Sequence, residues 1–438
     1  MTWDVVIPEG ETEGRVIITI TEIVDATLNY DVDCDNDGEF ELPGRTGNSF
    51  TCRYTTAGEH QIALRGQLTG LQMNCDGTLN TLLSIDQWGS IQWQTMDSFT
   101  NRCKSMHILA TDSPNLSQVT NMHAMFKSAY KMNENINCWD VSNVTDMSGL
   151  FQGAHKFDQP LDSWNVSNVT NMSGMFSNAQ AFNQPLNDWD VSSVTDMSYM
   201  FAYANGFNQP IEQWDVSNVT NMGWMFEYNR TFNQPLNNWK VLNVTNMSWM
   251  FWNADAFNQP LDKWDVGNVT NMNGMFSDSD AFNQPLNTWN VSSVTDMNGM
   301  FSHAKAFNQP LDQWDVGNVT DMNGMFSSAE AFNGALNGWG DNVSNVTNMT
   351  NMFESAQAFN QPLNLWNTSN VVDMSNMFKS TQVFNQPLDQ WDVGNVRIMT
   401  GMFSSAKAFN SALNGWHIPH VTSLAEMFAN TEVFNQPL

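Results

Sequence analysis

The residues with the clearest metal-binding spacing lie near the start of the chain. Asp33, Asp35 and Asp37 alternate along the sequence and are followed by Gly38. Alternate carboxylates that converge on one centre, with Gly for the turn, are typical of the opening of a calcium loop. Gly44 stands where an EF-hand requires a bidentate Glu, and no helical pattern flanks the loop. The sequence therefore excludes an EF-hand and leaves two readings, a weak calcium site or an acidic turn without a ligand.

A second set of polar residues directly follows the tryptophans of the chain. Each member stands between a Trp and a Val that are expected to point inward, so its own side chain should face outward. A second column of polar residues, two positions before each Trp, begins at Asp162 and runs beside the first. The pattern predicts an acidic, amide-rich ligand-binding face, although a merely solvated face fits it equally well. We call this predicted set the Asp/Asn face; it consists of Asp140, Asn165, Asp190, Asp215, Asp265, Asn290, Asp315 and Asp392.

These columns exist because a unit of 25 residues recurs from about Asn115 to the end of the chain. Trp139, Trp164 and Trp189 illustrate the spacing, which continues with one insertion of two residues between Trp339 and Trp366. Self-similarity at such a period indicates a solenoid, in which each unit buries its apolar face against its neighbours.

Within one repeat, residues 158–182, the apolar spacing predicts a strand over 161–166 and a short helix or 3₁₀ turns over 169–179. The asparagine after each repeat's last Phe, such as Asn183, should cap backbone groups as a buried amide ladder. The predicted core positions are Leu161, Trp164, Val166, Val169, Met172, Met175, Phe176, Ala179 and Phe182.

The N-terminal part of the chain lacks the 25-residue repeat. Residues 1–70 should form a small β-sandwich, residues 71–113 an adaptor with a degenerate first coil, and residues 114–438 about thirteen repeats. The sandwich is predicted from β-branched or aromatic runs at 15–20, 26–33, 49–55 and 60–68.

All five cysteines lie in the first third of the chain. Cys34 and Cys52 fall in segments that read as neighbouring strands and could pair, and Cys75 with Cys103 is a second possibility. Free buried thiols explain the set about as well. If two disulfides form, the odd count leaves one cysteine unpaired.

The repeat spacing L-x-x-W-x-V, followed by V-T-x-M and M-F, matches the plan of a leucine-rich repeat. With the run 218–222 (NVTNM) and Met225-Phe226, the chain resembles the BspA-like bacterial surface leucine-rich-repeat family, which includes mycoplasma-type lipoproteins. That resemblance implies a parallel-sheet α/β solenoid, a secreted or surface location, adhesion to host proteins, and no catalytic residues. Residues 29–33 and 54–62 resemble a PKD-type sandwich, which carries an acidic turn where the possible calcium loop lies.

The charge and hydropathy of the chain restrict its partners. A formal net charge of -29 should repel nucleic acid and anionic lipid surfaces. No run approaches the length of a membrane-spanning helix, and the first residues lack the basic and apolar regions of a signal peptide. We therefore expect no nucleic-acid partner and no membrane insertion, and we infer the surface location from the resemblance alone.

The leading functional hypothesis is a non-enzymatic recognition or adhesion protein that binds surface proteins, matrix proteins or glycans, with no cofactor other than a possible calcium ion. The alternative is an assembly protein that stacks end to end. The sequence ends at Leu438, before the position where the repeat would place its next Trp, so the last coil would expose an uncapped edge to another subunit. Two further hypotheses are ice or mineral binding through a threonine column that includes Thr170, and a polysaccharide lyase.

Overall fold

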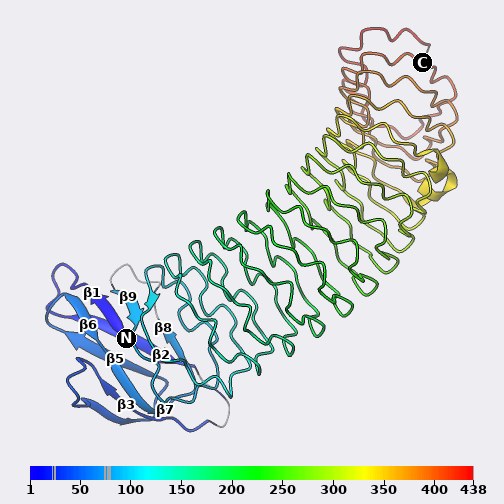
Figure 1. Ribbon diagram of the computed structural model, residues 1–438. Coiled ribbons are helices and arrows are strands. Elements are labelled where there is room, and N and C mark those ends of the chain that lie inside the picture. The colour runs from blue at the N-terminus through cyan, green and yellow to red at the C-terminus, as the bar shows by residue number, and fades with distance from the viewer. Residues whose placement is uncertain (22, 24–25, 74, 76–79, 438) are drawn as a thin grey trace. The chain divides into compact units, whose positions relative to one another are not determined.

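The computed structural model of the protein describes residues 1–21, 23, 26–73, 75 and 80–437 (Figure 1). The chain divides into two compact units, Met1–Pro210 and Ile211–Leu438. All strands found in the described residues lie in the first unit. Among the described residues of both units, no helix has the length and apolarity that crossing a membrane requires.

The strands form three small sheets, with strand orders β10-β9-β1-β6, β5-β2-β8 and β4-β3-β7. All pairings are antiparallel except that of β9 with β10. The strands are β1 (Thr2–Val5), β2 (Gly14–Ile20), β3 (Asn29–Asp33), β4 (Leu42–Arg45), β5 (Ser49–Tyr54), β6 (Gly58–Gln61), β7 (Ala63–Gln67), β8 (Leu71–Met73), β9 (Asn80–Ile85) and β10 (His107–Ile108).

Period-two alternation explains these strands. In β2, Val16, Ile18 and Ile20 are buried and the intervening side chains are not, which places one apolar face against the core. The predicted runs at 15–20 and 49–55 coincide with β2 and β5, whereas the run at 60–68 is divided between β6 and β7. Pairing continues beyond residue 70, because β9 joins β1 and β10 joins β9. The three-part domain division remains a prediction.

Two disulfides stabilise this region. Cys34 pairs with Cys52 and Cys75 with Cys103, as the sequence allowed, with Cα–Cα distances of 5.5 and 5.1 Å. Cys138 is free and exposed. The first disulfide ties the end of β3 to β5, and the second links the segment after β8 to the first degenerate coil.

The specimen repeat does not contain the predicted strand over 161–166, and of the two alternatives for 169–179 it has isolated i→i−3 turns, such as Met175 N–H to the Met172 carbonyl, and no helix. In the described residues, β pairing between neighbouring coils consists of isolated parallel bridges, such as Asn171 with Asp196 in the first unit and Asn246 with Asn271 in the second. The described residues contain no α-helix and one 3₁₀ helix, η1 (Asn337–Asn345), at the two-residue insertion. The predicted parallel-sheet α/β leucine-rich-repeat solenoid is therefore wrong: strand arrows occur only in the small N-terminal sheets (Figure 1).

The backbone hydrogen bonds explain this difference. The N–H groups of Gly174 and Phe176 donate to the following coil, whereas the N–H of Met175 donates back to Met172 within its own coil. Gly174 and Asn178 have φ of 61° and 57°, and left-handed residues four positions apart interrupt a helix. Because donors alternate between their own coil and the next one, neither a helix nor a continuous strand can form.

The predicted core of the repeat is confirmed. All nine positions listed for residues 158–182 are buried, and the most exposed, Trp164, is only 3% exposed. Equivalent rings stack from coil to coil, with Trp264 and Trp289 centroids 6.3 Å apart. The buried indole N–H of Trp289 donates to the Leu261 carbonyl of the preceding coil at 2.9 Å. At about 1.5–3 kcal/mol per buried large side chain, this core, rather than regular secondary structure, stabilises the coils.

The predicted amide ladder is also present, although it is not buried. The Asn283 N–H donates to Asn258 Oδ1 at 3.0 Å, and Asn283 Oδ1 accepts from the N–H of Asn308 at 2.9 Å. Asp158 plays the same role toward Asn183. These side chains are half-buried or exposed, so the ladder joins the edges of neighbouring coils at the surface.

Candidate functional site

The acidic residues of the predicted calcium loop lie together. One carboxylate oxygen from each of Asp33, Asp35, Asp37 and Glu41 lies within 4.8 Å of the others. Asp33 ends β3, and the turn before β4 brings Glu41 back to the group. The D-x-D-x-D-G pattern by itself does not include Glu41. Counted from Asp33, however, it occupies the ninth loop position, which carries a ligand in many calcium loops.

Asp33 has a structural role in this loop. It is 1% exposed. Its Oδ1 accepts the N–H of Asn36 at 2.6 Å, and its Oδ2 accepts the N–H of Gly38 at 2.9 Å. The Gly44 N–H donates to Asp31, so Gly44 belongs to a turn. The Asp33 carboxylate is therefore largely committed to holding the loop closed.

The other three carboxylates, from Asp35, Asp37 and Glu41, are exposed. Desolvation, followed by the negative charges of Asp37 and Glu41, raises the pKa of the Asp35 carboxyl. Burial, followed by the same acidic group, raises the pKa of the Tyr54 hydroxyl, which donates to the Cys34 carbonyl at 2.6 Å. Three crowded oxygen ligands suit a hard cation such as calcium, and calcium binding remains a prediction.

All eight residues of the Asp/Asn face are exposed, and all make the same local contact. The Oδ1 atom of each accepts the backbone N–H of the residue two positions later, at 3.1 Å in Asp190 and 3.0 Å in Asp315. The other six have the same bond. This contact is an Asx-turn, which Asp and Asn form readily. The turn explains why most coils carry Asp or Asn at this position, although Lys240, Gly340 and His417 occupy it in three others.

These turns also affect the acidity of the face. The Ser142 hydroxyl, followed by the Ser142 N–H, lowers the pKa of Asp140. Ser217 lowers the pKa of Asp215 in the same way. Both carboxylates therefore stay ionised at neutral pH, and the face carries negative charge.

The polar column that begins at Asp162 pairs its members across coils, and Asn137, one coil earlier, pairs with Asp162 in the same way. Asn137 Nδ2 donates to Asp162 Oδ1 at 2.8 Å in the first unit. Asn287 Nδ2 donates to Asp312 Oδ1 at 3.1 Å in the second. Such alternation of amide and carboxylate avoids repulsion between stacked like charges. The charges of this column are thus partly satisfied by neighbouring coils.

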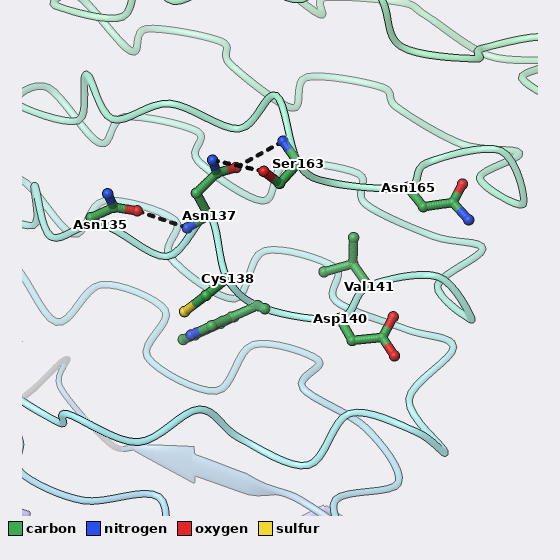
Figure 2. Close-up of a pocket in the computed structure, with 8 residues that line it drawn as sticks. Asn135, Asn137, Cys138, Asp140, Val141, Ser163 and Asn165 are labelled. Carbon is green, nitrogen blue, oxygen red and sulfur yellow. Dashed lines mark hydrogen bonds between the residues drawn. The ribbon is translucent and has the colours of Figure 1, made fainter.

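Two residues of the Asp/Asn face line a surface hollow of 580 Å³ (Figure 2). Figure 2 shows the Asn137 amide directed at Ser163, whose N–H and hydroxyl lie 3.0 and 3.1 Å from it. Trp139 and Val141 supply apolar atoms. The hollow therefore combines amide, carboxylate and apolar groups; it is lined by Asn135, Asn137, Cys138, Trp139, Asp140, Val141, Ser163 and Asn165.

The second unit gathers aromatic side chains that the apolar periodicity does not single out. The ring centroids of Tyr228 and Trp252 lie 4.9 Å apart, and those of Trp249 and Trp252 lie 5.0 Å apart. The sequence does contain a signal for this cluster. Trp249 and Trp252 stand at positions where a later coil has the small residues Gly299 and Ser302. We call these three residues the aromatic cluster.

Comparison with known proteins places the repeats in one family. The family described as "Mycoplasma protein of unknown function, DUF285" matches residues 94–205, 185–279, 259–342 and 341–438. No curated protein and no solved structure matches the chain. The four overlapping matches confirm the tandem repetition and cover most of the sequence. The chain therefore belongs to the DUF285 family of Mycoplasma proteins of unknown function.

Proposed function

We propose that this chain is a non-enzymatic recognition protein of the cell exterior, which binds protein or glycan ligands through the Asp/Asn face. The observation that carries this proposal is the geometry of that face. Each of its eight exposed side chains uses Oδ1 for its own turn. The second polar atom of each is not needed for the turn, so within each unit the repeated coils offer a series of similar groups to a partner.

The covalent structure and the charge support an exterior location. The disulfides Cys34–Cys52 and Cys75–Cys103 suit an oxidising compartment. A net charge of -29 disfavours nucleic acid and anionic lipid as partners. A relation to BspA-like bacterial surface proteins and a PKD-like sandwich over residues 1–70 form part of the same proposal. Membership of a Mycoplasma repeat family is compatible with it.

The test is a binding screen against matrix proteins such as fibronectin, laminin and collagen, and against a glycan array, with and without calcium. The matched variant is Asp190→Asn/Asp215→Asn/Asp265→Asn/Asp315→Asn, because Asn165 and Asn290 already form the same turn. We expect the variant to lose ligand while its melting temperature is unchanged. Wild-type affinity of the variant for every ligand that the wild-type protein binds, or no ligand for the wild-type protein, would count against the proposal.

The threonine column favours a structural role over ice or mineral binding. The Thr170 hydroxyl donates to the Thr145 carbonyl at 3.2 Å, and the Thr270 hydroxyl donates to the Thr245 carbonyl at 3.2 Å. These donors therefore link neighbouring coils and are not available to a lattice. Leu438, on which the end-to-end assembly hypothesis rests, lies outside the described residues. Assembly remains a prediction, which light scattering over a range of concentrations can check.

A further inference from the structure

Two positions in each coil have left-handed backbone conformation, and their occupants differ between coils. Gly274, Gly299 and Gly324 fill the first position in three successive coils, with φ of 59°, 60° and 59°. The same position holds Trp224 and Trp249, with φ of 59° and 56°. A bulky side chain is disfavoured in this conformation, whereas Gly is not. The fold therefore tolerates tryptophans here at a conformational cost that glycine would avoid.

The three rings of the aromatic cluster are held in fixed positions. A Cβ on Gly274 would overlap the Trp249 ring, so this indole lies directly against the backbone of the next coil. The Trp252 indole N–H donates to Asp278 Oδ2 at 3.1 Å. Tyr228 contacts Trp252 edge to face. All three side chains are half-buried, so each keeps part of its ring accessible to solvent.

Polar groups surround these rings. The Arg230 guanidinium lies 5.7 Å from the Tyr228 ring centroid. Its Nε donates to Asn253 Oδ1 at 3.0 Å and lies 3.5 Å from Asp255 Oδ2. The rim therefore offers hydrogen-bond donors from Arg and Asn and acceptors from Asp, beside a fixed aromatic surface.

We propose that the aromatic cluster is a binding platform for a neutral glycan. Aromatic rings contact the C–H face of a pyranose, while nearby amide, guanidinium and carboxylate groups bond its hydroxyls, so one apolar surface with a polar rim suits this ligand class. The acidic rim, with Asp255 and Asp278, together with the net charge of -29, disfavours anionic glycans. The cluster shares no residue with the Asp/Asn face, so this proposal stands independently of the proposed function.

The test compares wild type with Trp249→Gly/Trp252→Ser. These substitutions restore the residues of the coil that contains Gly299 and Ser302, so the variant should fold normally, as judged by its melting temperature. The probes are chitohexaose, cellohexaose and maltohexaose, with heparin as the anionic contrast, and binding is measured by titration calorimetry. We expect the wild-type protein to bind a neutral oligosaccharide and the variant to bind it at least about tenfold more weakly.

Two controls separate this platform from the Asp/Asn face. Trp252→Phe keeps one aromatic ring but removes the N–H bond to Asp278 and the second ring of the indole, so it should bind more tightly than Trp249→Gly/Trp252→Ser. The fourfold Asp→Asn variant of the face should retain the full wild-type affinity. The platform is refuted if the wild-type protein binds none of the neutral probes, if it binds heparin alone, or if Trp249→Gly/Trp252→Ser binds like wild type.

Discussion

Removal of one rung of the amide ladder tests how neighbouring coils are joined. Asn283 Oδ1 accepts hydrogen bonds from the N–H of Asn308 at 2.9 Å and from Gln309 Nε2 at 3.0 Å. Asn283→Ala removes both. Gln309 Nε2 also donates to the Asn283 carbonyl at 3.1 Å, so it keeps a partner, whereas the Asn308 N–H loses its acceptor. At about 0.5–1.5 kcal/mol per net hydrogen bond, we expect the free energy of unfolding to fall by about 1–2 kcal/mol.

The matched control is Asn283→Asp, because Asp158 already accepts the Asn183 N–H at 2.9 Å in an equivalent rung. Urea unfolding followed by tryptophan fluorescence gives the stability of both variants. Hydrogen exchange of the Asn308 amide gives the local effect, which should be about tenfold faster in the alanine variant for a loss of about 1.4 kcal/mol. Equal stability of the two variants, or unchanged exchange at Asn308, would refute the assigned role of the side chain.

Three further predictions concern the first disulfide, the acidic loop and the left-handed glycines. Cys34→Ser/Cys52→Ser opens a loop with a sequence separation of 18 and should cost about 3 kcal/mol, seen as a lower melting temperature; an unchanged temperature would contradict it. The folded-state pKa of Asp35 lies above its ordinary value of 3.8, so the folded protein binds this proton more tightly than the unfolded chain and gains stability as the pH falls toward that value. Asp35→Asn should therefore stabilise the calcium-free protein at neutral pH and weaken this pH dependence, as measured by urea unfolding; loss of stability at neutral pH would count against it. Gly274→Ala should be about 1–3 kcal/mol more destabilising than Gly299→Ala, because both have positive φ but only the first Cβ overlaps an indole ring; equal thermal melts would exclude this clash.

The period and the core could be read directly from the sequence. Apolar residues such as Val169, Met172 and Phe176 must be removed from water whichever backbone conformation they adopt, so their spacing identifies the buried face. The asparagine column was also predictable as structural, because a repeated amide can satisfy backbone groups of the next coil. The Asp/Asn column could be recognised as outward-facing, although its role in an Asx-turn was not apparent.

Other features depend on contacts that the spacing of residue types does not show. Glu41 reaches the acidic group only through the turn between β3 and β4. Trp249 and Trp252 become a surface cluster with Tyr228 because successive coils bring equivalent turns side by side. A single repeat contains no information about the neighbouring coil that supplies these partners.

The secondary structure of the repeats also depends on contacts between neighbouring coils. The spacing around Val169 and Met172 fits one face of a helix, and the spacing from Leu161 to Val166 fits a strand, yet residues 161–179 form neither element. The sequence by itself determined the period, the buried positions and the polar columns, because these follow from side-chain chemistry. Only the tertiary structure decided the backbone path, because each N–H can bond within its own coil or to the next, and stacking of the coils selects between the two.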